Sequence, residues 1–278
     1  MHTQSLIALL GICSDENSSF RRGAAQAPPL IREALLTDAS NMWTETGVNL
    51  GELQEKNLLI DVGDIAPTPG DDFFDQIQTT IHHLLAKESS PISLGGDHAI
   101  TFPILQGFAQ HFSELTILHI DAHPDLYDEL GGNRLSHACP FARIMEAGLA
   151  KRLIQVGIRT LNQHQREQAA RFGVEIHEMK DWHLGLKLHF DTPVYVSIDL
   201  DGLDPAFAPG VSHREPGGLS TREVIHLIHS IPTRIIGADV VEYNPLCDFQ
   251  GMTATVAAKL VKELAGKIFL ERSSEVAK

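Results

Sequence analysis

Six short apolar runs, bounded by Gly, Pro or Asp, alternate with amphipathic stretches along this chain of 278 residues. Near-continuous apolar runs of this length are typical of strands that are covered on both faces, as in a parallel sheet. The alternation predicts βαβ units and a three-layer α/β/α fold with a mostly parallel sheet, as a single domain over residues 1–278. The predicted strands are Leu6–Leu10, Pro91–Leu94, Leu115–Ile120, Leu153–Val156, Val194–Ile198 and Ile235–Val241.

The stretches between these runs have the spacing of apolar residues that one helix face requires. One of them opens with Ser220 and Glu223, three residues apart, which is the spacing of a capping box. The predicted helices are Pro29–Leu36, Phe73–Lys87, Thr101–Phe112, Phe141–Leu149, Gln163–Phe172, Thr221–Ser230 and Thr253–Phe269.

The charge balance is strongly acidic, with 22 Lys and Arg against 36 Asp and Glu and a formal net charge of −14. Phosphate binding needs a basic face, so this balance argues against a nucleic-acid partner. It agrees with a cationic ligand or a bound metal, although solubility alone explains it equally well.

The three cysteines, Cys13, Cys139 and Cys247, are widely spaced and form no C-x-x-C pair. They predict neither a disulfide framework nor a zinc-thiolate site, which favours a reducing compartment. The first apolar run is too short for a signal peptide or a membrane span and has no basic residues before it. We therefore expect a cytoplasmic protein without a membrane partner.

Four of the predicted strands end in polar, ionisable residues, whereas the strand interiors are apolar. In a parallel sheet the carboxyl ends of the strands open into loops at one edge, which is where sites form. The four endings are Gly95-Gly96-Asp97-His98, Asp121-Ala122-His123-Pro124-Asp125, Asp199-Leu200-Asp201 and Glu242-Tyr243-Asn244.

The spacing within these endings predicts a metal site. Asp121, His123 and Asp125 stand two residues apart, so an extended backbone directs them to one side. A lone Asp-x-Asp is usually a turn or a helix cap, and a lone His after two glycines is usually structural. When these carboxylates and imidazoles all lie at one sheet edge, however, the carboxylates repel one another unless cations compensate their charge. The candidate ligands are His98, Asp121, His123, Asp125, Asp199 and Asp201.

The ligand types indicate which metal to expect. Oxygen-rich ligands with imidazole and without thiolate favour a hard or borderline divalent ion such as Mn²⁺, with Ni²⁺ or Co²⁺ as substitutes. Six side chains exceed what one tetrahedral zinc ion needs, so two ions that share bridging carboxylates fit better.

The three segments that contain the candidate ligands, Gly95–His98, Asp121–Asp125 and Asp199–Asp201, resemble the signatures of the ureohydrolases, the family of arginase and agmatinase. The resemblance extends from Asn17 to Ala254. Three further segments look most like plant-type arginases, namely Ser136-His137-Ala138, Ala206–His213 and Gly237–Pro245.

The resemblance implies an arginase-like sheet of about eight strands, two Mn²⁺ ions per subunit and a homo-oligomer, either a trimer or a hexamer. It implies that one ion takes His98, Asp121, Asp125 and Asp199, and that the other takes His123, Asp121, Asp199 and Asp201. It also implies that Glu242 pairs with a substrate guanidinium and that His137 shuttles protons. The expected reaction is hydrolysis of L-arginine to L-ornithine and urea.

The chemistry of a guanidinium explains why these residue types are needed. Its resonance-stabilised carbon resists neutral water, and two metal ions can hold a bridging hydroxide at neutral pH. Glu242 would fix the planar cation by a bidentate pair. Asp125 could then relay the proton of the former hydroxide to the leaving amine, with His137 exchanging protons with solvent.

The loop from Asp128 to Ser136 supplies the candidates that would read the far end of the substrate. Asn133 and Ser136 match plant-type positions and could donate to an α-carboxylate, although the same loop could simply be polar and solvated. Agmatine or another guanidino compound therefore stays an alternative substrate.

Two other classes of protein are alternatives, namely a different metallohydrolase, such as a deacetylase or a phosphoesterase, and a catalytically silent member of the family. A deacetylase needs a single zinc ion and has no use for the surplus ligands. A phosphoesterase binds an anionic phosphate group, which Glu242 in the pocket would repel. A catalytically silent binding member of the family would be expected to have lost a ligand or the shuttle, and both are present here.

Overall fold

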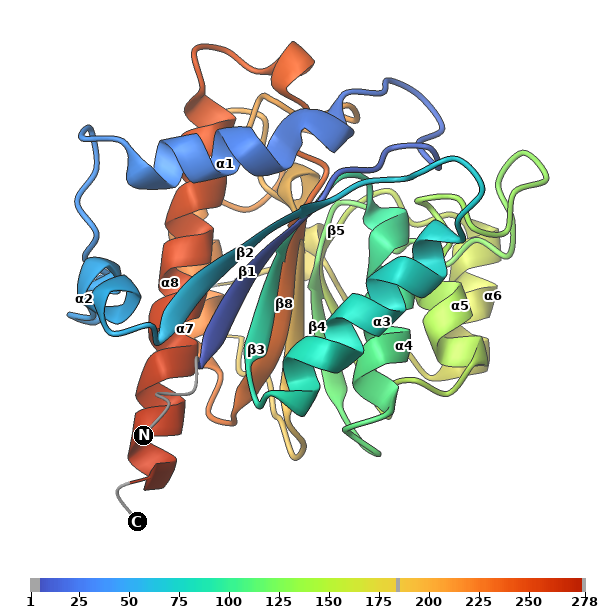
Figure 1. The fold of residues 1–278 in the computed structure, drawn as a ribbon. Coiled ribbons are helices and arrows are strands. Elements are labelled where there is room, and N and C mark those ends of the chain that lie inside the picture. The colour runs from blue at the N-terminus through green and yellow to red at the C-terminus, as the bar shows by residue number, and fades with distance from the viewer. Residues whose placement is uncertain (1–5, 184–185, 277–278) are drawn as a thin grey trace.

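The computed structural model describes residues 6–183 and 186–276, which contain one continuous sheet covered by helices on both faces (Figure 1). The sheet has eight strands in the order β2-β1-β3-β8-β7-β4-β5-β6, and every neighbouring pair is parallel. The strands are β1 (Ile7–Ile12), β2 (Leu59–Ile65), β3 (Ser90–Leu94), β4 (Thr116–Ile120), β5 (Arg152–Ile158), β6 (Glu175–Glu178), β7 (Val194–Asp199) and β8 (Ile235–Val241).

The helices form two layers, one on each face of the sheet (Figure 1). One layer contains α1 (Ala27–Leu36), α2 (Leu50–Glu55), α7 (Thr221–Ser230) and α8 (Met252–Val276). The other contains α3 (Phe73–Ala86), α4 (Thr101–Ala109), α5 (Pro140–Glu146) and α6 (Gln163–Phe172).

Alternate residues of the central strands enter two separate hydrophobic cores. On β4, Leu118 and Ile120 pack with the α8 side, while Ile117 packs with the α4 side. All three side chains are fully buried, as expected for strands with helices on both faces. The near-continuous apolar runs of the sequence follow directly from this three-layer arrangement.

All six predicted strands are confirmed, and the two that the sequence did not reveal lie at the edges. β2 reads Leu-Ile-Asp-Val-Gly-Asp-Ile and is mostly exposed, and β6 reads Glu-Ile-His-Glu. An edge strand is buried on fewer sides and therefore lacks the continuous apolar run that marks an inner strand. The predicted capping box of α7 is present, with Ser220 and Glu223 bonded reciprocally.

The four strands with ionisable endings are neighbours in the sheet, in the order β3-β8-β7-β4. Ile120 pairs with Ile198, and Ile198 pairs with Val240, so these strands end at nearly the same level. The residues that follow them therefore meet at one edge, at the centre of the sheet.

In the residues that the structure describes, no helix combines the length and the apolar character that crossing a bilayer would demand.

Candidate metal centre

The six predicted ligands come together in the loops at the carboxyl ends of β3, β4 and β7. His98 lies on a short 3-10 turn after β3, and the close approach of that turn to Ser14 requires glycine, because a Cβ on Gly96 would lie 1.7 Å from the Ser14 carbonyl oxygen. Five of the six ligands are buried, and the sixth, His123, is partly exposed. Asp125 has a left-handed backbone with φ 50°, a conformation that is rare outside glycine and is often found at functional sites.

One group of ligand atoms surrounds the imidazole of His98. Its Nδ1 lies 3.2 Å from Asp121 Oδ2, 3.3 Å from Asp125 Oδ2 and 3.2 Å from Asp199 Oδ2. Three carboxylate oxygens therefore face a single nitrogen that can carry at most one proton.

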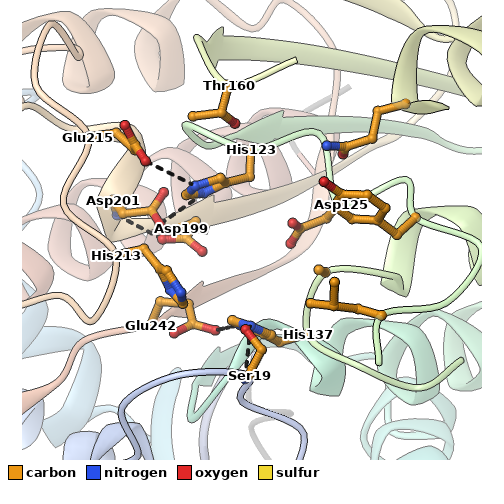
Figure 2. A pocket seen from close by; sticks show the side chains of 14 residues that line it. Ser19, His123, Asp125, His137, Thr160, Asp199, Asp201, His213, Glu215 and Glu242 are labelled. Carbon is orange, nitrogen blue, oxygen red and sulfur yellow. Dashed lines mark hydrogen bonds and ion pairs between the residues drawn. The ribbon is translucent and has the colours of Figure 1, made fainter. Parts of the chain in front are cut away.

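A second group surrounds the imidazole of His123. Its Nδ1 lies 3.1 Å from Asp201 Oδ2 (Figure 2). The same nitrogen lies 3.4 Å from Asp121 Oδ1. Asp121 thus contributes one carboxylate oxygen to each group and links the two. Asp199 and Asp201 are linked through the backbone, because the Asp201 N–H donates to Asp199 Oδ1 at 2.7 Å.

The hydrogen bonds behind His98 test whether this donor set fits a metal ion. Asp239 accepts hydrogen bonds from the hydroxyls of Tyr195, Thr101 and Ser197, so the Ser197 proton points to Asp239. The Ser197 oxygen lies 2.9 Å from His98 Nε2 and must accept from it. In the neutral His98 ring, the lone pair of Nδ1 is therefore directed at three carboxylates and is repelled by them. A divalent cation between these groups would turn the repulsion into attraction. The residues fit a metal ion.

Electrostatics support the same conclusion. Burial, together with the neighbouring Asp201 and Asp121 carboxylates, raises the pKa of Asp199 well above its usual value. Burial and Asp121 likewise raise the pKa of Asp125 to about 6. Burial alone would lower the pKa of His98, but hydrogen bonds to Asp121, Asp125 and Asp199 raise it well above its usual value, so without a metal ion a proton on Nδ1 supplies the positive charge among these carboxylates. These carboxylates favour any arrangement that places positive charge among them.

A cavity of about 290 Å³ opens above the ligands (Figure 2). Glu242 and His137 line it, together with His123, Asp125, Asp199 and Asp201. The size suits a small molecule, since ligand pockets start at about 300 Å³.

Glu242 and His137 form a hydrogen-bonded pair on one wall of this cavity. Glu242 Oε1 accepts from the His98 N–H at 3.0 Å and lies 2.8 Å from His137 Nδ1. The Nδ1 proton of His137 is donated to Glu242, while Nε2 accepts from the Ser19 N–H at 3.2 Å in the neutral ring and can donate to the Ser19 hydroxyl, 2.8 Å away, in the charged ring. Burial alone would lower the pKa of His137, but the Glu242 carboxylate raises it to about 9. Glu242 also has a left-handed backbone, with φ 63°.

Asn133 and Ser136 do not line this cavity but a neighbouring hollow, which shares Ser19 and Leu130 with it. The Asn133 side-chain amide donates to Asn17 Oδ1 at 3.0 Å, and the Ser136 hydroxyl accepts from the Ala138 N–H at 3.3 Å. Both side chains thus bond to the loops at the rim, and a role in reading the substrate stays a prediction.

The sequence did not single out several residues that the structure brings to the site. The centroid of the His213 ring lies 5.9 Å from that of His123 and 5.4 Å from that of His137. Glu215 Oε1 lies 3.9 Å from His123 Nε2. His213 ends the segment Ala206–His213, whose resemblance to plant-type arginases gave this histidine no role, and Glu215 follows it in the same loop without a signal of its own. His119 is different, because it stands two residues before Asp121 on β4, and the same period-two rule could have placed it on the side of the ligands.

Comparison with known proteins gives consistent matches over nearly the whole chain. Residues 5–266 match the family described as "Arginase family". The chain is 48% identical to "Arginase 1, mitochondrial" of Arabidopsis thaliana, over 94% of this chain and 80% of that protein. It is 34% identical to "Guanidino acid hydrolase, mitochondrial" of Homo sapiens, over 92% of this chain and 76% of that protein. A solved arginase from Medicago truncatula, 44% identical, superposes with a TM-score of 0.88 over 95% of this chain and 88% of that structure.

Proposed function

This chain belongs to the arginase family of ureohydrolases, and from its site we propose that it hydrolyses L-arginine to L-ornithine and urea with two Mn²⁺ ions. The observation that carries the proposal is the pair of ligand groups around His98 and His123, joined by Asp121, beneath a cavity that contains Glu242. The choice of arginine rests on relatives named arginase at 48% and 44% identity, against 34% for a relative named for guanidino acids.

In this proposal, one ion is held by His98, Asp121, Asp125 and Asp199, and the other by His123, Asp121, Asp199 and Asp201. Mn²⁺ suits this mixture of carboxylate and imidazole, and Ni²⁺ or Co²⁺ could replace it. When bound, the two ions supply hydroxide at neutral pH and polarise the reacting group. Asp121 has the geometry to bridge, because each of its oxygens faces a different imidazole.

Glu242 binds and orients the substrate. Its carboxylate is 4% exposed and faces the cavity, so a guanidinium that enters meets a nearly dry negative charge. The His98 N–H and His137 hold the carboxylate in place through Oε1, which keeps it from turning toward solvent. Such an oriented pair places the guanidinium carbon over the ligand cluster.

Proton movement is assigned to Asp125 and His137. The tetrahedral adduct collapses to urea only if the departing amine nitrogen gains a proton, and Asp125 lines the cavity where it can carry one to that nitrogen. His137 reaches from Glu242 to the Ser19 loop at the rim, so it can exchange protons between the cavity and solvent. The residue roles, the assembly into a trimer or hexamer and a cytoplasmic location stay predictions.

The test is urea release by the purified Mn²⁺-loaded protein with L-arginine, agmatine, 4-guanidinobutyrate and guanidine, with and without a chelator. We expect the highest kcat/KM for L-arginine and a loss of activity on chelation. A higher kcat/KM for agmatine or 4-guanidinobutyrate would keep the chemistry but overturn the substrate. No urea with Mn²⁺, Ni²⁺ or Co²⁺ would refute the enzymatic proposal and favour a silent binding member of the family.

A further inference from the structure

We propose that His119, held in one tautomer by Gln155, is a positioning residue that fixes the Asp121 carboxylate for metal binding. This inference rests on the proposed metal site, because it treats Asp121 as a ligand. It adds a part of the site that lies behind the ligands: a buried chain of hydrogen bonds running from the Pro124 carbonyl through Gln155 and His119 to Asp121.

The direction of each hydrogen bond in this chain follows from its first member. The Pro124 carbonyl can only accept, and Gln155 Nε2 lies 2.6 Å from it. This contact fixes the orientation of the Gln155 amide, even though Gln155 Oε1 is then buried without a hydrogen-bond partner. The second proton on Gln155 Nε2 is donated to His119 Nδ1 at 3.0 Å.

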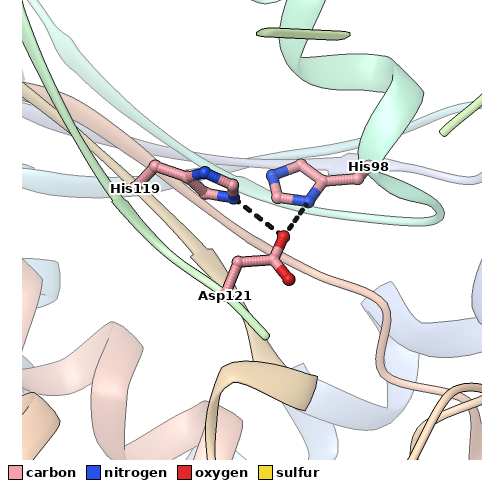
Figure 3. A group of neighbouring side chains, drawn as sticks. All are labelled: His98, His119 and Asp121. Atoms are coloured by element: carbon pink, nitrogen blue, oxygen red, sulfur yellow. Dashed lines mark hydrogen bonds and ion pairs between the residues drawn. The ribbon is translucent and has the colours of Figure 1, made fainter. Parts of the chain in front are cut away.

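The tautomer of His119 follows. Because Nδ1 accepts from Gln155, the ring proton is on Nε2, and Nε2 lies 2.8 Å from Asp121 Oδ2. Asp121 Oδ2 therefore accepts a hydrogen bond from a neutral donor, while the same oxygen faces His98 Nδ1 at 3.2 Å (Figure 3).

His98, His119 and Asp121 are close enough to resemble a three-ligand metal group, but His119 is poorly placed to be a ligand. Both of its ring nitrogens are used, one by Gln155 and one by Asp121. The ring is fully buried and stacks on Phe141, with centroids 3.9 Å apart and planes 28° apart, so it is not free to turn. His119 therefore acts through Asp121 and not on the ion directly.

Asp121 is held at both oxygens by this arrangement. Oδ1 accepts from the His123 backbone N–H at 2.6 Å, and Oδ2 accepts from His119. A carboxylate held at both oxygens presents its remaining lone pairs to the His98 and His123 groups and loses less conformational entropy on binding than a free one. Loss of a hydrogen-bond partner of this kind typically costs about 10- to 100-fold in metal affinity.

The experiment measures Mn²⁺ binding by isothermal titration calorimetry on the apo forms of the wild type, His119→Leu and His119→Gln. Leucine removes the donor, whereas glutamine can offer an amide N–H near the position of Nε2. We expect His119→Leu to bind Mn²⁺ about 10- to 100-fold more weakly and His119→Gln to recover most of that loss. A purely structural role would instead lower the melting temperature of both apo variants without separating their affinities.

Gln155→Leu provides a second arm that leaves His119 in place. It should weaken Mn²⁺ binding in the wild type and have little further effect in His119→Leu, because the two residues act in one chain. If His119→Leu does not fold, the contrast between Gln155→Leu and the wild type decides the question.

The outcomes separate the two proposals. A wild type that binds no Mn²⁺ refutes the metal site itself. A wild type that binds Mn²⁺, together with a folded His119→Leu or Gln155→Leu of unchanged affinity, refutes only the positioning role of His119.

Discussion

Replacing Glu242 with glutamine tests the substrate-binding proposal most directly. Glutamine has the same shape, and its side-chain oxygen can still accept from the His98 N–H and from His137, which lie 3.0 Å and 2.8 Å from Oε1. The positive φ of 63° is equally hard for both residues, so it adds no new strain. The substitution therefore removes one negative charge from the cavity and little else.

The size of the effect follows from the burial of that charge. Glu242 is 4% exposed, and leaving one member of a buried ion pair unpartnered costs about 3–5 kcal/mol. Because the cavity opens to solvent, we take the lower end, about 3 kcal/mol, which corresponds to a loss of about 100-fold in kcat/KM at 1.4 kcal/mol per tenfold.

The assay is urea release from L-arginine by Glu242→Gln at saturating Mn²⁺, with Mn²⁺ affinity measured on the same preparation. Glu215→Gln is the matched control, because the Glu215 side chain lines the same cavity but is 40% exposed and lies 3.9 Å from His123 Nε2. We expect the control to lose less than about tenfold, as for a solvent-screened charge. Equal losses in the two variants, or a fully active Glu242→Gln that binds Mn²⁺ normally, would refute the role of Glu242.

Three further predictions concern Asp125, removal of the metal and the thiol of Cys13. At saturating Mn²⁺, Asp125→Asn should lower kcat by about 100-fold or more with substrate affinity largely kept, and an unchanged kcat would rule out the proton relay. Chelation of the metal should lower the melting temperature by about 5–10 °C, because an ion at about 100 times its Kd stabilises the folded protein by about 2.7 kcal/mol, and added Mn²⁺ should restore it. An unchanged melting temperature would argue against a resident metal. Burial and the Asp64 carboxylate raise the pKa of Cys13 from 9.0 to about 11. Between these two pH values the thiol is protonated in the native protein and ionised in the unfolded chain, so the free energy of unfolding should fall as pH rises from 9 to 11. Alkylation of native Cys13 at pH 8, followed by mass spectrometry, should be about 100-fold slower than in the unfolded chain, and equal rates would contradict this shift.

The fold was predictable from the sequence wherever a strand is covered on both faces. The runs at Leu115–Ile120 and Ile235–Val241 predicted β4 and β8 almost to the residue, because an inner strand of a parallel sheet is apolar at most of its positions. β2 and β6 were missed for the converse reason, since edge strands tolerate residues such as Asp61 and Glu175. The short helix α2, over Leu50–Glu55, was also missed, because six residues are too few for a clear period.

The candidate site could also be predicted in part from the sequence, because metal binding requires carboxylates and imidazoles that stand out after apolar strands. Carboxylates and imidazoles spaced two residues apart after apolar runs can be recognised along the chain, and they predicted the candidate ligands that the structure brings together. His119 obeys the same rule, but a histidine inside a strand carries no chemical signal until its partners are seen.

What only the tertiary structure decided is which strand lies beside which. The order β3-β8-β7-β4 joins endings that are up to 144 residues apart in sequence, as in the hydrogen bond between His98 and Glu242. The tautomers of His98 and His119 depend on Ser197 and Gln155, which reach these rings from other strands, and on Asp239, which accepts the Ser197 proton. Sequence specifies local periodicity and residue chemistry, whereas the direction of a buried hydrogen bond depends on acceptors that only packing brings within reach.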